Sequence, residues 1–263
     1  MANLTQLVHL DLSSNSFTGS IPNFTANLTE LVYFYMSLNS FIGPIPAFNM
    51  AKNLVYIDLS NNHLTGQFTF THWKELPSLA KLCLSNNKLS GQIHEFSSSS
   101  LLMVWLDLSR NYLEGPIPTS IGKLQHLRSL LLSSNNFNGS FQLNVFQQLT
   151  NLEELDLSDN SLLIEYNGTN SSLSPFSLIE SLRLASLKLK TFPSFLRNQT
   201  SLLILDLSRN QIHGEIPNWI WELDLLQLNL SYNYLEGPLL NLSSLGMLDL
   251  RSNQFQGQLP TPP

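Results

Sequence analysis

One six-residue string recurs along the chain at nearly regular intervals, and this repeat constrains the fold more than any other feature. The string Leu10-Asp11-Leu12-Ser13-Ser14-Asn15 returns with small changes in copies that begin at Ile57, Leu106, Leu155, Leu205 and Leu248. Counting weaker copies, the repeat asparagines are Asn15, Asn39, Asn62, Asn87, Asn111, Asn135, Asn160, Asn210, Asn233 and Asn253. Leu187 takes the equivalent place in a degenerate unit, so the chain holds eleven units of 20 to 27 residues.

Apolar residues precede each asparagine at fixed offsets, as Leu4, Leu7, Leu10 and Leu12 do before Asn15. This spacing is that of a leucine-rich repeat. Its central segment alternates, which predicts a short strand with leucines directed inward and the intervening residues directed outward. No single unit can bury its leucines alone, so neighbouring units must stack their strands into one parallel sheet.

The residues after each strand predict turns. A buried asparagine amide can pair with backbone groups that the bend leaves unsatisfied, at a saving of about 1–3 kcal/mol each. Nine units carry glycine four residues later, often followed by Ile-Pro. Glycine permits backbone conformations that other residues avoid, and proline favours an extended chain. We therefore expect an α/β-type repeat solenoid, right-handed, with the parallel β-sheet on its concave face and extended or 3-10 segments on its convex face.

The composite pattern, Leu-x-x-Leu-x-Leu-Ser-x-Asn-x-Leu-x-Gly-x-Ile-Pro, resembles the plant-specific repeats of receptor kinases and receptor-like proteins. More narrowly, the segment from Leu182 to Gln199, with Glu215 to Trp221 after it, is similar to receptor-like proteins of the Verticillium wilt resistance type. That family usually has a cysteine where this chain has Leu187. The resemblance implies a glycoprotein on the extracellular side of the plasma membrane that acts in plant defence signalling. It also implies a protein or peptide ligand and a co-receptor with leucine-rich repeats.

The ends of the chain differ from those of the family. Residues 1–263 form a single array of about eleven repeats that begins inside a repeat, without a signal peptide or cysteine-bearing cap. No apolar stretch is long enough to span a bilayer, and the C-terminal cap is also lacking. We interpret the sequence as a fragment of an extracellular array, whose membrane attachment would come through a segment missing from this chain.

Neither catalysis nor metal binding is predicted. The six histidines are scattered over different units, Cys83 is the only cysteine, and no phosphate-binding or kinase motif is present. The formal net charge of −6 without a basic run argues against nucleic-acid binding. We predict no enzyme activity, no cofactor and no catalytic residue.

The outward strand positions are where recognition can vary on a constant scaffold. An aspartate four residues before most asparagines recurs so regularly that it is interpreted as framework, whereas the position six before is irregular. Tyr and Trp are common in binding hot spots. The candidate binding residues on the concave face are His9, Tyr33, Tyr35, Tyr56, Lys81, Trp105, Glu154 and Arg183. Aromatic packing across strands without a ligand is the alternative interpretation.

The sequence also predicts glycosylation sites, a surface loop and a free thiol. The candidate N-glycosylation sites are Asn3, Asn23, Asn27, Asn138, Asn167, Asn170, Asn198, Asn229 and Asn241. Asn229 lies at a strand offset where aspartate is usual, so it either carries a glycan on the concave face or replaces the framework aspartate. The segment 167–172 is expected to be a surface loop. Cys83 is expected to be an unpaired thiol, with intermolecular pairing as the alternative.

Three functions fit the sequence. The first is a ligand- and partner-binding segment of a cell-surface receptor-like protein. The second is a secreted wall-associated repeat protein of the polygalacturonase-inhibitor kind. The third is a non-functional truncated fragment.

Overall fold

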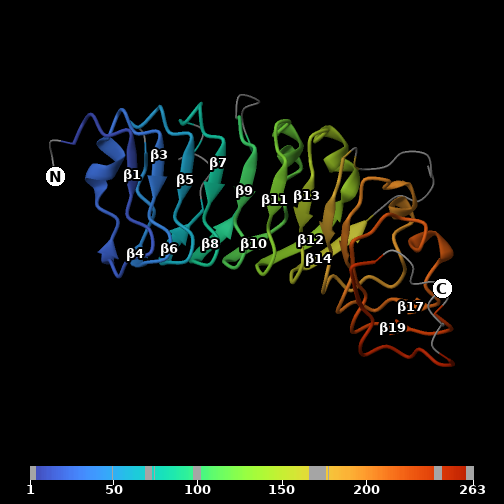
Figure 1. The fold of residues 1–263 in the computed structure, drawn as a ribbon. Helices are drawn as coiled ribbons and strands as arrows, with labels where there is room; N and C mark the ends of the chain where they lie inside the picture. Colours follow the sequence, from blue (N-terminus) through green and yellow to red (C-terminus); the bar gives the residue numbers. More distant parts are fainter. Residues whose placement is uncertain are drawn as a thin grey trace.

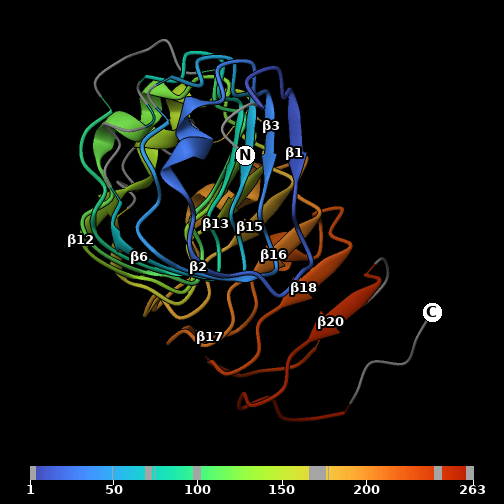
Figure 2. The same cartoon turned by 90° about the vertical axis from the view of Figure 1, so that its left-hand side faces the viewer.

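The computed structural model describes residues 4–48, 50–68, 73, 75–96, 102–165, 176, 178–239 and 245–258. The chain winds into successive coils that stack from the N-terminal to the C-terminal end, and the stack changes direction in its C-terminal third (Figure 1). Figure 2 looks along the stack and shows strands on one side of each coil and short helical turns on the other. The repeat solenoid that the sequence predicts is confirmed.

One parallel sheet, here called the main sheet, runs through the whole array. Within the described residues it has eleven strands, each of three residues, which pair in chain order. They are β1 (His9–Asp11), β3 (Tyr33–Tyr35), β5 (Tyr56–Asp58), β7 (Lys81–Cys83), β9 (Trp105–Asp107), β11 (Ser129–Leu131), β13 (Glu154–Asp156), β15 (Ser181–Arg183), β16 (Ile204–Asp206), β18 (Gln227–Asn229) and β20 (Met247–Asp249).

The register of the main sheet is constant from unit to unit. Leu106 in β9 pairs with Leu130 in β11, and Leu130 pairs with Leu155 in β13. All three leucines are fully buried, and full burial of such a side chain contributes roughly 1.5–3 kcal/mol. Because the register is constant, the residues that flank each leucine also form columns on the outer side of the sheet.

The asparagines form the predicted column of buried amides. The Asn62 Nδ2 amide donates to the carbonyls of Met36 at 3.0 Å, Leu59 at 3.2 Å and Ser60 at 3.1 Å, while its Oδ1 accepts the Phe41 N–H at 3.0 Å. Asn87, Asn111, Asn135 and Asn160 repeat this pattern. Each side chain therefore links two consecutive units, and the predicted role of these asparagines is confirmed.

The aspartate column is framework, as predicted. The Asp58 Oδ1 accepts hydrogen bonds from the Ser60 N–H at 3.0 Å and the Ser60 hydroxyl at 2.7 Å. The same pair of contacts joins Asp107 to Ser109. These carboxylates thus close the turn that follows each strand.

A second parallel sheet follows the turn, and the sequence reasoning missed it. Within the described residues its seven strands are β2 (Thr18–Ser20), β4 (Ser40–Gly43), β6 (His63–Gln67), β8 (Lys88–Gln92), β10 (Tyr112–Gly115), β12 (Asn136–Gln142) and β14 (Ser161–Glu165). A pair apart from it comprises β17 (His213–Gly214) and β19 (Tyr234–Leu235). Seven of the nine repeat glycines lie in these strands, and all nine have positive φ, for example 85° at Gly139, which is the conformational role that the sequence suggests.

The far side of the coils carries the expected 3-10 turns. They are η1 (Asn23–Asn27), η3 (Thr119–Lys123), η4 (Leu143–Gln148), η5 (Ser194–Asn198) and η6 (Asn218–Ile220). Proline occupies the cap position of η1, η3, η5 and η6 in an extended conformation, because it fixes φ and needs no amide partner there. No helix of the described chain is long and apolar enough to cross a membrane.

The second sheet ends before the degenerate unit. Its last strand in the described residues is β14, and the next strands along the chain on this side, β17 and β19, form the separate pair. Leu187 has no side-chain amide. Its backbone N–H and that of Leu189 both donate to the Asn210 Oδ1, at 2.9 and 3.0 Å. The main sheet stays continuous across this unit, so the array keeps its strand register where the asparagine is lost.

Candidate ligand-binding surface

Six of the candidate binding residues form one continuous strip across β1, β3, β5, β7 and β9. This strip, the aromatic row, consists of His9, Tyr33, Tyr35, Tyr56, Lys81 and Trp105. The constant register sets its order, because His9 pairs with Tyr33, Tyr33 with Tyr56, Tyr56 with Lys81, and Lys81 with Trp105. The strip is thus a direct product of the repeat and of the residues at its variable positions.

Neighbouring rings of the row are in contact. The ring centroids of His9 and Tyr35 are 5.3 Å apart, and those of Tyr35 and Tyr56 are 4.9 Å apart in an edge-on arrangement. The Lys81 Nζ lies 5.6 Å from the Tyr56 ring centroid and 6.0 Å from that of Trp105. These are distances at which a cation is attracted to a ring face. The side chains therefore hold one another in place before any partner arrives.

The exposure of the row differs from the expectation that all its rings face solvent. Tyr33 is 39% exposed, whereas Tyr35, Tyr56 and Trp105 are half-buried by their neighbours. The Trp105 Nε1 is buried and has no hydrogen-bond partner among the described residues. The indole consequently offers a ligand its ring surface rather than its N–H group. Cross-strand aromatic packing is present, and each of these side chains keeps part of its surface exposed.

The Tyr56 hydroxyl in the row and the Cys83 thiol beside it both have raised pKa values and stay neutral at neutral pH. Burial, followed by the nearby charges of Asp58 and Asp107, raises the pKa of the Cys83 thiol to about 12. Burial is also the largest cause of the raised pKa of the Tyr56 hydroxyl, which lies 4.0 Å from the Cys83 Sγ. Cys83 is a free thiol. At neutral pH the centre of the row is an apolar surface with one cation, Lys81.

Glu154 and Arg183 lie outside the row. They belong to β13 and β15, and an ion pair of 2.9 Å joins the Arg183 Nη1 to the Glu154 Oε1. The Ser129 hydroxyl donates to the Glu154 Oε2 at 2.8 Å. Both charges are satisfied internally, so these two candidates form a separate polar cluster. Ser129 was not among the candidate binding residues, because its hydroxyl acquires this role only through its neighbour.

The candidate glycosylation sites separate into two groups. Asn23, Asn27, Asn138 and Asn198 are exposed and lie on 3-10 turns or the second sheet, away from the main sheet. Asn229 lies within β18, where its Oδ1 accepts the Ser231 N–H and hydroxyl at 3.1 and 2.7 Å. Asn229 therefore occupies the framework role of the aspartates. Asn3, Asn167, Asn170, Asn241 and the loop predicted at 167–172 lie outside the described residues.

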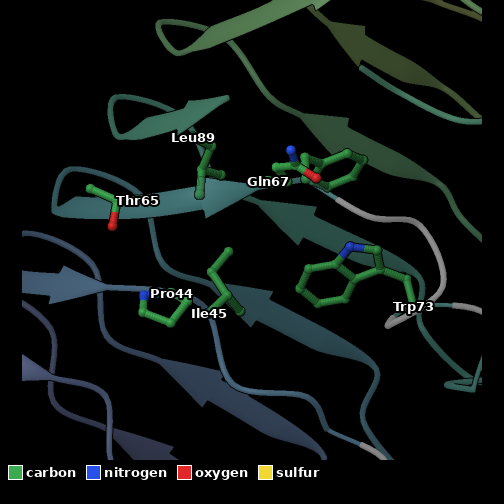
Figure 3. A pocket seen from close by; sticks show the side chains of 7 residues that line it. Pro44, Ile45, Thr65, Gln67, Trp73 and Leu89 are labelled. Atoms are coloured by element: carbon green, nitrogen blue, oxygen red, sulfur yellow. The ribbon is translucent and has the colours of Figure 1, made fainter. Parts of the chain in front are cut away.

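The array has a small cavity away from the aromatic row. Figure 3 shows its lining, which comes from β6, β8 and adjacent turns and consists of Pro44, Ile45, Thr65, Gln67, Phe68, Trp73 and Leu89. Its volume of about 50 Å³ suits one or two water molecules rather than a ligand. The Trp73 Nε1 is buried and has no hydrogen-bond partner among the described residues. No cluster of three potential metal ligands occurs in the described residues.

Comparisons with known proteins agree with this architecture. Two family models described as leucine rich repeat match the chain, one at residues 101–162 and one at residues 6–28, 53–72, 151–177 and 201–223. Receptor like protein 24 of Arabidopsis thaliana is 37% identical over 89% of this chain, and Receptor like protein 26 is 38% identical over 90%. The chain spans only 30% of the length of either relative.

Two solved structures of plant leucine-rich-repeat proteins are similar in shape to this chain. The crystal structure of PEPR1–AtPEP1 matches with a TM-score of 0.81 and 31% identity, over 98% of this chain and 37% of that one. The plant peptide hormone receptor RGFR1 in complex with RGF2 matches with a TM-score of 0.74 and 30% identity, over 97% of this chain and 45% of that one.

Proposed function

Because the chain belongs to the leucine-rich-repeat receptor-like proteins of plants, we propose that it forms part of a ligand-binding ectodomain on the extracellular side of the plasma membrane. The aromatic row carries this proposal. It supplies accessible ring surface and one cation on a rigid five-strand platform, which is the chemistry of protein–protein hot spots. A peptide or protein ligand and a leucine-rich-repeat co-receptor are the proposed partners, and defence signalling is the proposed process.

Two further observations support binding rather than catalysis. The side chains of the row pack on one another, so little conformational entropy would be lost when a partner covers them. Their acidic neighbours are occupied as framework, as in the hydrogen bonds from Ser60 to Asp58. The proposed function includes no chemical step.

The test replaces Tyr56 and Trp105 with Ala in the complete receptor ectodomain. Synthetic peptides with the sequences of secreted plant and microbial peptides are screened for binding to the parent ectodomain. The Kd of each hit is then measured by calorimetry on the parent and on the double variant. Loss of two hot-spot side chains should weaken binding by at least about 2 kcal/mol, roughly 30-fold in Kd. Tyr112→Ala is the control, since Tyr112 is 56% exposed on the second sheet and should leave binding unchanged. Hits that bind the folded double variant as tightly as the parent would remove the row from the binding site.

A further inference from the structure

A second candidate surface lies at the opposite end of the array, beyond the ends of β16, β18 and β20. In every unit the residue just before the repeat asparagine, or before Leu187, has a positive φ, for example 54° at Arg209 and 56° at Tyr232. Arg209 and Tyr232 occupy this position in consecutive units, and Arg251 follows one unit later, two residues before Asn253. We call these three residues the Arg-Tyr-Arg cluster.

The cluster is held together by stacking. The Arg209 Cζ lies 4.9 Å from the ring centroid of Tyr232, and the Arg251 Cζ lies 5.4 Å from the same centroid. The units stack in the order β16, β18, β20, so the ring is placed between the two guanidinium groups. Stacking on an aromatic face fixes the plane of a guanidinium while leaving its N–H groups free at the edge. Both arginines are therefore oriented before a partner binds.

The hydrogen-bonding capacity of the cluster is largely unused. Arg209 forms no ion pair within the described part of the chain. Asp206, three residues before it, already accepts the Ser208 N–H at 2.8 Å and the Asn229 amide at 3.1 Å. Arg251 contacts the Asp249 Oδ2 through its Nε at 3.3 Å, which leaves its two terminal amino groups available. Two guanidinium groups with free donors thus stand out on a chain of net charge −6.

The separation of the two arginines selects the kind of anion. Two strand spacings place them about 10 Å apart, which a single phosphate or sulfate cannot bridge. Each guanidinium matches the planar geometry of a carboxylate. Because an extended chain advances about 3.3–3.6 Å per residue, carboxylates two or three residues apart can meet both arginines. We propose that the Arg-Tyr-Arg cluster docks an extended acidic segment of a partner protein, with two carboxylates two or three residues apart.

This docking site is separate from the aromatic row. The row spans β1 to β9, whereas the cluster follows β16 to β20, with β11, β13 and β15 between them. One partner could therefore contact the row while another binds the cluster. The two surfaces can also be inactivated independently, so failure of one assignment leaves the other intact.

The test measures binding of a fluorescent hexapeptide, Gly-Glu-Gly-Gly-Glu-Gly with both ends blocked, by anisotropy on the full 263-residue chain. The same peptide with Gln in place of Glu is the ligand control. Arg209→Ser is the main variant, because serine already occupies this register with positive φ at Ser14, Ser134, Ser186 and Ser252. Arg110→Ser is the matched protein control. Arg110 has the same register, exposure and φ of 54°, but it stacks on no ring among the described residues.

We expect the Glu peptide to bind, the Gln peptide not to bind, and added salt to weaken the interaction. Arg209→Ser and Arg251→Gln should each raise Kd at least tenfold, whereas Arg110→Ser should leave it unchanged. Tyr232→Ser keeps both charges but frees the guanidiniums, so it should raise Kd several-fold. Circular dichroism of each variant separates loss of binding from loss of fold.

Three results would overturn the proposal. The first is equal binding of the Glu and Gln peptides, or equal losses in Arg209→Ser and Arg110→Ser. The second is no binding of the Glu peptide by the parent chain; a lowered melting temperature in Arg209→Ser would then make the cluster a structural contact between units. The third is tighter, Arg209-dependent binding of an oligogalacturonate, which assigns the site to a carboxylated polysaccharide instead.

Discussion

Replacing Asn111 with Ala tests how much one member of the asparagine column stabilises the array. Asn111 is 5% exposed. Its Oδ1 accepts the Leu89 N–H at 3.0 Å, and its Nδ2 donates to the carbonyls of Leu84, Leu108 and Ser109 at 3.0–3.1 Å. The substitution removes all four hydrogen bonds and so weakens the connection between two units.

The expected loss of stability depends on which hydrogen bonds each partner of Asn111 keeps after the substitution. The Leu84 and Leu108 carbonyls keep hydrogen bonds from Asn87 and Asn135, at 3.1 and 3.0 Å. The Ser109 carbonyl keeps the Asn86 N–H at 3.0 Å. The Leu89 N–H loses its side-chain acceptor, and a buried unpaired donor costs about 1–3 kcal/mol. With the net value of the other lost bonds, Asn111→Ala should destabilise the array by about 2–4 kcal/mol.

Urea unfolding followed by tryptophan fluorescence provides the measurement, with Asn136→Ala as the control. Asn136 is exposed in β12, so its replacement should change the free energy of unfolding by less than about 0.5 kcal/mol. Hydrogen exchange should locate the loss of protection in the units on either side of Asn111, because contacts in a solenoid are between neighbours. If both variants unfold at the same urea concentration, the column does not stabilise the array as argued.

Two further predictions concern backbone strain and pH. Gly139 has a φ of 85°, and an added Cβ would meet only the Pro116 Cβ at 3.8 Å, so Gly139→Ala should cost about 1–2 kcal/mol through backbone strain; an unchanged melting temperature would contradict this. The Cys83 pKa is raised from 9.0 in the unfolded chain to about 12, so the thiol favours the folded state below pH 9 and loses that contribution as pH rises toward 12. The free energy of unfolding should decline over that range more steeply than in Cys83→Ser, and parallel pH profiles would count against a buried thiol.

Much of the candidate site could be predicted from the sequence, because residues at the same position of successive repeats lie in the same structural environment. Once Asn39 and Asn62 are aligned, Tyr33 and Tyr56 must be neighbours on the outer side of the sheet, and the structure pairs them. The partial burial of Trp105 was not foreseeable in the same way. It depends on the rotamers that side chains on neighbouring strands adopt, and strand alternation does not specify these.

The sequence by itself determined the spacing of the repeat, the inward leucines, the amide column and the framework aspartates. Each of these depends on residues a few positions apart, or on a spacing that repeats. Tertiary structure alone decided how the Asn210 Oδ1 accepts the Leu187 N–H, how Glu154 meets Ser129 and Arg183, and how Tyr232 comes to lie between Arg209 and Arg251. These contacts join side chains in different units. Their geometry depends on rotamers that neighbouring coils select only after the units have stacked.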